Sequence, residues 1–317
     1  MTGRWIAGAP VSFGVWGPHA GAPDGDGDAI LGALAAAGYA GSELGDTGFL
    51  GDPGRTADAF GTHRLAPAGV YVGLPLARGE WSAPERAGFA LTCRTLRAAV
   101  DRHALTGDPG APAARIVLAD DGAPGLDAPR DPADRASGLG DAAWARAVDL
   151  LAEAAATAAG HGLATTFHPH LGTYVESTWE VDRLLATTPL TVTLDTGHAL
   201  LAGTDPVGAV ARWAGRIDHV HLKDVRLDVP RAARRGGPVP LRDWWADANV
   251  PFGAGDVDLA GVLRELRRDG YAGWLVVEQD AAPHGGPQLA RFAADQEHNL
   301  RVLRGLLDDR PGDGPGD

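Results

Sequence analysis

The chain has 317 residues, of which 44% are hydrophobic, and 41 acidic against 28 basic residues give it a formal net charge of −13. This length and apolar content suit one large α/β barrel, while the acidic balance disfavours binding to nucleic acid or to an anionic membrane surface. A single cysteine, Cys93, excludes a disulfide framework and a cysteine-based zinc cluster.

The opening residues, 1–17, lack the long apolar stretch of a signal peptide, and no later segment is apolar enough to span a bilayer. We therefore expect a cytoplasmic protein. Eight apolar runs typical of strands then alternate with longer stretches that have apolar residues at helical spacing. The strand candidates are residues 5–14, 41–45, 68–76, 114–120, 163–170, 190–198, 217–225 and 273–280.

Helix signals lie between these runs. Asp28 is placed to cap a helix before the second strand, and Ser177 with Glu180 forms a capping-box pattern after the fifth. The longest helical stretch covers residues 141–162 and closes at a glycine. Strand and helix signals in alternation predict a parallel sheet.

Eight rounds of alternation in this length predict an α/β fold with a single (β/α)8 TIM barrel, whose active site lies at the C-terminal mouth of the strands. No Gly-x-Gly-x-x-Gly turn follows the first strand, which disfavours a dinucleotide-binding domain. We assign residues 1–306 to the barrel and residues 307–317 to a disordered tail. Long loop insertions at 121–139 and 226–251 follow the fourth and seventh strands.

Polar residues gather where the last four strands end, and the C-terminal ends of barrel strands converge on one mouth. Any one of these residues alone could hold a structural hydrogen bond or cap a turn. Together they make a set of imidazole and carboxylate groups that suits a divalent cation. The set comprises His168, His170 and Glu176, then Asp195 and His198, then His219, His221, Lys223 and Asp224, and finally Glu278, Gln279 and Asp280.

Other positions near the predicted mouth have two interpretations. Glu43, at the end of the second strand, could reach the mouth or favour a helix N-terminus. Trp16 could line the pocket wall or pack in the core. Trp244 and Trp245 could form a lid or an oligomer contact.

Several motifs bear a family resemblance. The segments "LDTGH", "HVHLKD", "GAGDVDL" and "GWLVVEQD" resemble the xylose-isomerase-like TIM-barrel superfamily of sugar isomerases and epimerases over nearly the whole chain. Within it, "IAGAPVSFGVWG", "AGYAGSELG" and "FHPHLGTYVES" are most similar to the inosose (2-keto-myo-inositol) dehydratase branch.

The resemblance implies a divalent metal, with Mn²⁺ or Co²⁺ favoured and Mg²⁺ or Zn²⁺ as alternatives. It implies Asp195, His221 and Glu278 as ligands. The glutamate that sugar isomerases have on the fifth strand has no direct counterpart here, so His168 or Glu176 completes the set. We favour Glu176, because a carboxylate better balances the charge of the ion.

The activity implied is a lyase reaction that dehydrates a cyclic polyol ketone of the inosose type through a metal-stabilised enediolate. His170 or His198 would act as the base, with Glu278 as a further candidate, and Lys223 or a histidine cation would supply a proton. Binding of the substrate would involve the remaining candidates, Glu43, Trp16, His168 and Asp224.

Alternatives stay open at this point. Return of the proton to the opposite face would make the protein an isomerase or epimerase, and a wider pocket would allow cleavage of a 3-keto-glycoside. A non-catalytic sugar-binding or scaffold subunit is the alternative of another class. We expect a small polyol or sugar as the substrate, no nucleic-acid or membrane partner, and a homo-oligomer by analogy with the family.

Overall fold

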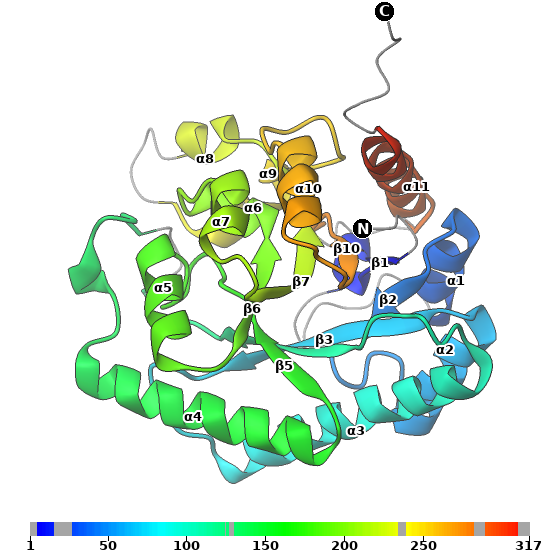
Figure 1. Ribbon diagram of the computed structural model, residues 1–317, viewed down its shortest axis with the longest axis horizontal. Coiled ribbons are helices and arrows are strands. Elements are labelled where there is room, and N and C mark those ends of the chain that lie inside the picture. Colours follow the sequence, from blue (N-terminus) through cyan, green and yellow to red (C-terminus); the bar gives the residue numbers. More distant parts are fainter. Residues whose placement is uncertain are drawn as a thin grey trace, which may run out of the picture.

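The computed structural model describes residues 5–15, 27–123, 125–126, 130–233, 239–281 and 289–309. Eight parallel strands close into a barrel that runs from β1 through β2 to β7 in order and then through β10 back to β1 (Figure 1). The predicted (β/α)8 TIM barrel is therefore confirmed. The barrel strands are β1 (Ile6–Gly8), β2 (Gly41–Glu43), β3 (Ala66–Leu74), β4 (Arg115–Asp120), β5 (Ala164–Phe167), β6 (Thr191–Asp195), β7 (Ile217–Leu222) and β10 (Leu275–Val277).

Helices surround the barrel and connect its strands. The longer ones are α1 (Gly27–Ala37), α2 (Pro53–His63), α3 (Ala83–Thr106), α4 (Asp141–Gly160), α5 (Thr178–Thr187), α10 (Leu259–Arg268) and α11 (Leu289–Asp308). Shorter ones are η1 (Pro10–Phe13), η2 (Arg135–Ser137), α6 (Thr196–Leu201), α7 (Pro206–Arg212), α8 (Asp228–Ala233), η4 (Leu241–Asp243) and α9 (Trp245–Ala248). The expected capping box of Ser177 and Glu180 is present at the start of α5.

Several strands end earlier than the sequence pattern predicts. Strand β1 stops at Gly8, because Pro10 has no N–H to donate to a sheet and instead begins η1. Strand β10 stops at Val277, so Glu278 is the first residue beyond it. Strand β7 stops at Leu222, and the next residues form a separate strand, β8 (Asp224–Val225), which pairs antiparallel with β9 (Asn249–Val250).

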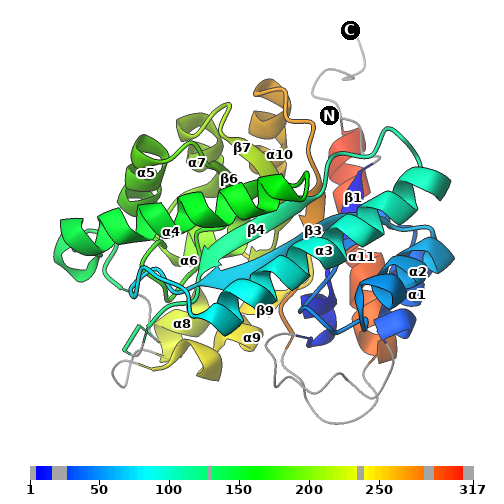
Figure 2. The same cartoon turned by 90° about the horizontal axis from the view of Figure 1, so that it is seen from below.

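The segment 226–251 is more ordered than the loop insertion that we predict from sequence. Its described residues form α8, η4, α9 and β9. Trp244 and Trp245 are buried there with Leu171 and Ala248 in a small apolar cluster. Figure 2 shows α8 and α9 together at one end of the barrel.

Helix α11 extends to Asp308, two residues beyond the end that we expect for the barrel at 306. Leu307 explains the difference, since its side chain is buried in the main apolar core. The remaining tail residues, 310–317, lie outside the described residues.

The N-terminal end of the barrel is closed by apolar side chains. Trp274 is fully buried there, packs edge-to-face against Trp5 and donates a hydrogen bond from Nε1 to the Pro112 carbonyl. Gly41 is needed beside it, because a Cβ at this position would lie 2.5 Å from the carbonyl oxygen of Ala66 and 2.8 Å from the Trp274 ring. A packed N-terminal end leaves the C-terminal mouth as the open one.

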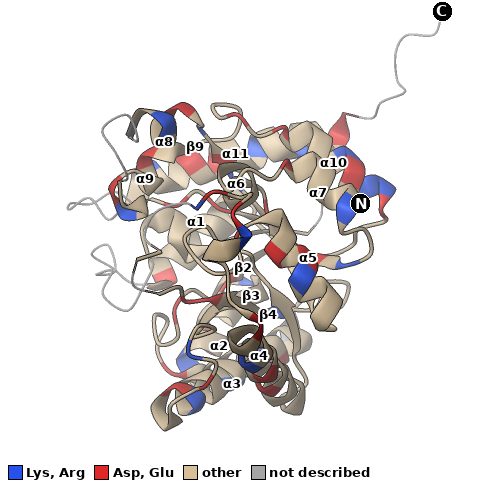
Figure 3. Cartoon of the chain, turned by 90° about the vertical axis from the view of Figure 1, so that its left-hand side faces the viewer, with Lys and Arg blue, Asp and Glu red and all other residues tan. Residues whose placement is uncertain are grey.

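The outside of the barrel is covered by charged helices. Helices α3 and α4 lie side by side along the strands in both Figure 1 and Figure 2. Figure 3 shows basic and acidic residues interspersed over the elements on the side that it presents. Among the described residues, no helix combines the length and apolar character needed to cross a membrane.

Candidate metal centre and active site

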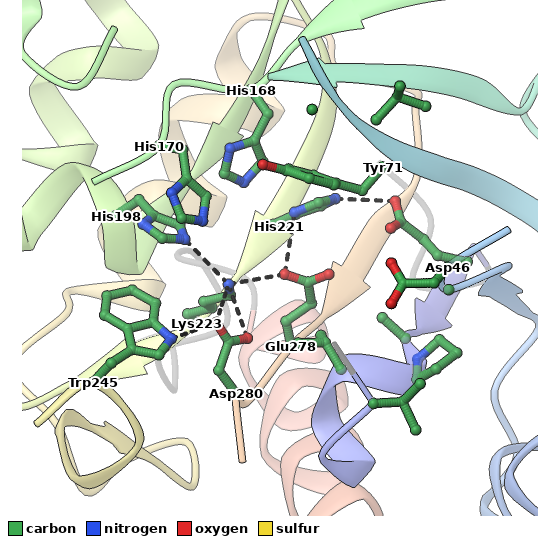
Figure 4. Close-up of a pocket in the computed structure, with 18 of the residues that line it drawn as sticks. Asp46, Tyr71, His168, His170, His198, His221, Lys223, Trp245, Glu278 and Asp280 are labelled. Carbon is green, nitrogen blue, oxygen red and sulfur yellow. Dashed lines mark hydrogen bonds and ion pairs between the residues drawn. The ribbon is translucent and has the colours of Figure 1, made fainter. Parts of the chain in front are cut away.

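A cavity of about 670 Å³ lies at the C-terminal ends of the strands (Figure 4). Apolar residues after β1, on β3 and in η4 form part of its wall, and ionisable side chains form its polar part. The ionisable residues that line it are Glu43, Asp46, Tyr71, His168, His170, His198, His221, Lys223, Arg242, Glu278 and Asp280.

Asp195, the last residue of β6, serves two purposes with its two oxygens. Its Oδ1 accepts hydrogen bonds from the backbone N–H groups of Gly197 and His198, both at 2.9 Å, and so caps α6. Its Oδ2 lies 3.3 Å from Nε2 of His168 and 3.7 Å from Nδ1 of His221. Capping therefore orients the carboxylate, and the second oxygen is left for the site.

His221 is held from the opposite side by Glu43. Its Nε2 lies 3.0 Å from Oε1 of Glu43, and Nε2 of His219 lies 2.9 Å from the same oxygen. Both imidazoles lie on one face of β7, as the two-residue period of a strand requires. The Nδ1 atom of His221 then faces the mouth, 3.2 Å from Oε2 of Glu278.

Three donor atoms thus converge, namely Nε2 of His168, Oδ2 of Asp195 and Nδ1 of His221, and Oε2 of Glu278 lies 3.2 Å from the last of them. The first three lie within 4.8 Å of one another, a separation that a cation with bonds of about 2.2 Å would close with small side-chain movements. Glu43, His219 and His221 lie equally close together, and the hydrogen bonds that join them, at 2.9 and 3.0 Å, are shorter than the 3.3 Å contact between His168 and Asp195.

The chemistry of this set fits a divalent cation. Among the described residues, the buried Nδ1 of His221 has no hydrogen-bond partner, although two carboxylate oxygens lie near it. Burial alone would lower the pKa of His221, but Glu278 and Glu43 outweigh burial and hold that pKa well above its ordinary value. The cluster therefore favours a positive charge at Nδ1, which a proton or a metal ion can supply.

Glu176, which we favoured as the fourth ligand, lies apart from this cluster. Its Oε2 accepts a hydrogen bond from the Gly172 N–H at 2.5 Å, and its Oε1 accepts one from the Arg130 N–H at 3.0 Å. The guanidinium of Arg130 adds an ion pair at 3.3 Å. The carboxylate of Glu176 therefore holds two loops together. His168 lies beside Asp195 and His221, where we expected Glu176 to lie.

Asp224, expected to bind substrate, also has a structural environment. Its carboxylate accepts backbone hydrogen bonds from Gly253, Gly255 and Val257 at 2.8, 3.0 and 3.2 Å. A Cβ at position 255 would lie 2.1 Å from Oδ1 of Asp224, so only glycine permits this approach. Asp224 anchors the turn before α10 and does not line the cavity formed by the described residues.

Lys223 lies at the centre of the polar part of the cavity (Figure 4). It is the chain's only lysine among 28 basic residues. Its Nζ lies 3.3 Å from Oδ2 of Asp195, 3.1 Å from Oε2 of Glu278 and 3.0 Å from Asp280. Burial alone would lower the pKa of Lys223, but these three carboxylates hold that pKa well above its ordinary value. The ammonium is therefore a counter-charge for the acidic groups.

Asp280, which the sequence places at the mouth without a role, and Trp245, which we did not assign to the site, both belong to it. Nε1 of Trp245 donates a hydrogen bond of 2.7 Å to Oδ2 of Asp280. The Trp245 ring stacks on the His198 ring, with centroids 4.5 Å apart and planes at 19°. Asp280 has a sequence signal, since it follows Glu278 by two residues, whereas nothing local places Trp245 here.

His170 and His198 lie side by side at the cavity, with ring centroids 3.9 Å apart. Burial, reinforced by the charge of His168, lowers the pKa of His170 to about 3. Burial, reinforced by His170, likewise holds the pKa of His198 well below its ordinary value. Both rings are therefore neutral at neutral pH. Trp16, predicted to line the wall, lies outside the described residues.

Comparisons with known proteins agree with this architecture. The family described as xylose isomerase-like TIM barrel matches residues 31–304. The rhizopine catabolism protein MocC of Rhizobium meliloti is 37% identical over 280 residues, which cover 83% of this chain and 81% of MocC. An inosose dehydratase of Geobacillus kaustophilus is 33% identical over 288 residues, which cover 88% of each chain.

A solved structure shares the fold. The IOLI protein, crystallised with a bound zinc atom, superposes with a TM-score of 0.66 at 14% identity, over 96% of this chain and all of that one. The resemblance seen in the sequence motifs is thereby confirmed, including the similarity to proteins named inosose dehydratase. On the extent of the family match, this chain belongs to the xylose isomerase-like TIM barrel family.

Proposed function

We propose that the protein is a divalent-metal-dependent lyase that removes water from a cyclic polyol ketone of the inosose type. The observation that carries this proposal is the group of His168, Asp195 and His221, with Glu278 against His221 and with His170 and His198 beside it. The curated relatives named inosose dehydratase and MocC support the substrate class.

The metal would be held by Nε2 of His168, Oδ2 of Asp195, Nδ1 of His221 and Oε2 of Glu278. Two imidazoles and two carboxylates are a donor set that Mn²⁺, Co²⁺ or Zn²⁺ accepts, and we favour Mn²⁺ or Co²⁺. A divalent cation bound there acts as a Lewis acid that polarises the substrate carbonyl and favours loss of the neighbouring proton.

The chain's own residues supply the remaining functions. A base must take the proton from the carbon next to the carbonyl, and the imidazoles of His170 and His198 line the cavity. Lys223 helps to hold the pKa values of Asp195 and Glu278 below their ordinary values, and it forms an ion pair with Asp280. Its raised pKa makes it a poorer proton donor than we expected from sequence.

The test combines metal removal with product analysis. Protein treated with a chelator is reloaded with Mn²⁺, Co²⁺, Mg²⁺ or Zn²⁺ and incubated with keto-inositols, and the products are examined by mass spectrometry. Loss of the mass of one water molecule, dependent on metal and abolished in Asp195→Asn and Glu278→Gln, is expected. Glu176→Gln serves as the control that keeps the metal.

Two other results would redirect the assignment. A product with the same mass as the substrate would indicate an isomerase or epimerase on the same site, because return of the proton shares the first step of the elimination. Absence of both metal binding and turnover would leave a non-catalytic sugar-binding subunit.

A further inference from the structure

Leu171 lies between His170 and His198 and contacts both of them through its backbone. Its carbonyl oxygen is 2.9 Å from Nδ1 of His170, and its N–H donates a hydrogen bond of 3.2 Å to Nδ1 of His198. One residue therefore presents an acceptor to one imidazole and a donor to the other.

This contact determines which nitrogen of His170 carries hydrogen. A carbonyl oxygen only accepts, so Nδ1 of His170 must be the protonated nitrogen. In a neutral imidazole the other nitrogen, Nε2, then has a free lone pair. The surrounding loop is well held, because the His170 N–H donates to the Val175 carbonyl and Thr173 Oγ1 donates to the His170 carbonyl.

The same argument gives His198 the opposite form. A backbone N–H only donates, so Nδ1 of His198 must be the bare nitrogen, and Nε2 carries the hydrogen. One contact competes with this form, since Nζ of Lys223 lies 3.5 Å from Nε2 of His198. The ammonium has three carboxylates as acceptors, whereas the peptide N–H of the buried Leu171 has no freedom to turn away.

We propose that Leu171 divides the work of the two histidines, so that His170 takes the substrate proton and His198 donates a hydrogen bond to the departing hydroxyl group. This inference rests on the proposed dehydration and assigns the base that was left open above. Leu171 is a positioning residue that acts through its backbone, and stacking on Trp245 keeps the His198 ring in its plane.

The atoms balance without any other reagent. The bond between hydrogen and the carbon beside the carbonyl breaks, its proton passes to Nε2 of His170, and its electron pair forms an enolate. The bond from the next carbon to its hydroxyl then breaks. The hydroxyl, held by the Nε2–H of His198, leaves with the proton returned by His170. One water molecule is released, and both imidazoles end in their starting forms.

A direct test reads the hydrogen positions without any substrate. Protein labelled with ¹⁵N-histidine, with and without Mg²⁺ or Zn²⁺, is examined by NMR for the tautomer of each ring, and His170→Gln and His198→Gln identify the signals. We expect hydrogen on Nδ1 of His170 and on Nε2 of His198. The same tautomer in both rings, or hydrogen on Nδ1 of His198, would overturn the inference.

A second test separates the two roles in the reaction. Exchange of the substrate proton with D₂O reports on proton removal, and release of water reports on the complete reaction. His170→Gln should slow both by about 100-fold or more. His198→Phe, which keeps a ring to stack on Trp245, should slow water release while exchange stays within about threefold, since that step needs only His170.

His198→Gln is the matched variant for His198→Phe, because its amide restores an N–H donor and should recover part of the water release. Equal loss of exchange in the Phe variant would show that His198 is the base and would refute the division of roles. If the wild-type protein neither exchanges the proton nor releases water from any keto-inositol, the proposed function fails, while the NMR result still decides the tautomers.

Discussion

Oε1 of Glu43 lies 3.0 Å from Nε2 of His221, across 178 positions of sequence. Glu43 belongs to β2 and His221 to β7, so the carboxylate reaches across the interior of the barrel. Acceptance of this hydrogen bond places hydrogen on Nε2 and turns Nδ1 toward Asp195 and Glu278. Carboxylates behind metal-bound histidines commonly fix the ring in this way.

Glu43→Gln should therefore weaken metal binding. An amide in place of the carboxylate lowers the basicity of His221 and frees its orientation, which at such positions costs about 10- to 100-fold in metal affinity. Titration calorimetry with Mn²⁺ or Zn²⁺ measures the change. Glu176→Gln is the matched control, since it also replaces a buried glutamate but should bind the metal as the wild type does. Equal metal affinities in the wild type and in Glu43→Gln would show that Glu43 does not orient His221 for metal binding.

Lys223→Met should destabilise the metal-free protein by about 3–5 kcal/mol, because Asp195, Glu278 and Asp280 would lose the cation that compensates them. Urea unfolding with and without Zn²⁺ measures the loss, and the metal should restore part of it. A lysine-selective isotope label gives one side-chain NMR signal, since Lys223 is the only lysine. Unchanged stability of the methionine variant would contradict the counter-charge role.

Asp224→Asn should lower stability without altering substrate binding. The two carboxylate oxygens of Asp224 accept hydrogen bonds from three backbone N–H groups. Asparagine has only one acceptor oxygen, so we expect the substitution to cost about 1–3 kcal/mol of stability. Asp256→Asn, an exposed change in the same turn, is the control. A large rise in KM with no loss of stability would return Asp224 to the substrate-binding residues.

Asp120, which is not part of the candidate metal centre, should make the stability of the protein depend on pH. Burial raises the pKa of its carboxyl from 3.8 to about 6, although the Tyr174 N–H donates to it. Between these values the folded protein binds more protons than the unfolded chain, so this contribution favours folding below pH 3.8 and disappears as pH rises through 6. It amounts to about 3 kcal/mol.

The measurement compares wild type with Asp120→Asn. Relative to that variant, the free energy of unfolding of the wild type should fall between about pH 4 and pH 7 and then level off. Subtraction of the two urea-unfolding series cancels the titration of the other groups. A difference that rises with pH over this interval would show that Asp120 is stabilised as the anion.

Most of the barrel is predictable because its signals are local. Alternating strand and helix patterns give eight strands in their correct order, and a parallel barrel brings every strand end to the same mouth. His168, Asp195, His221 and Glu278 could therefore be placed near one another from position alone. The strand ends were less predictable, as Pro10 and the separate β8 illustrate.

The choice between His168 and Glu176 depended on distant residues. Both follow β5, and charge balance favoured the glutamate. Arg130, in the long segment after β4, pairs with Glu176 and holds it away from the mouth. No local pattern around Glu176 contains this information, because the partner belongs to another loop.

The sequence by itself determined the strand order and the kinds of polar groups at the mouth, since periodicity and residue type are properties of short segments. Only the tertiary structure decided how those groups are used. It joined Glu43 to His221, brought Trp245 and Asp280 to Lys223, and set Leu171 between two histidines. Such contacts depend on hydrogen-bond directions between segments far apart in the chain, and these exist only once the barrel has closed.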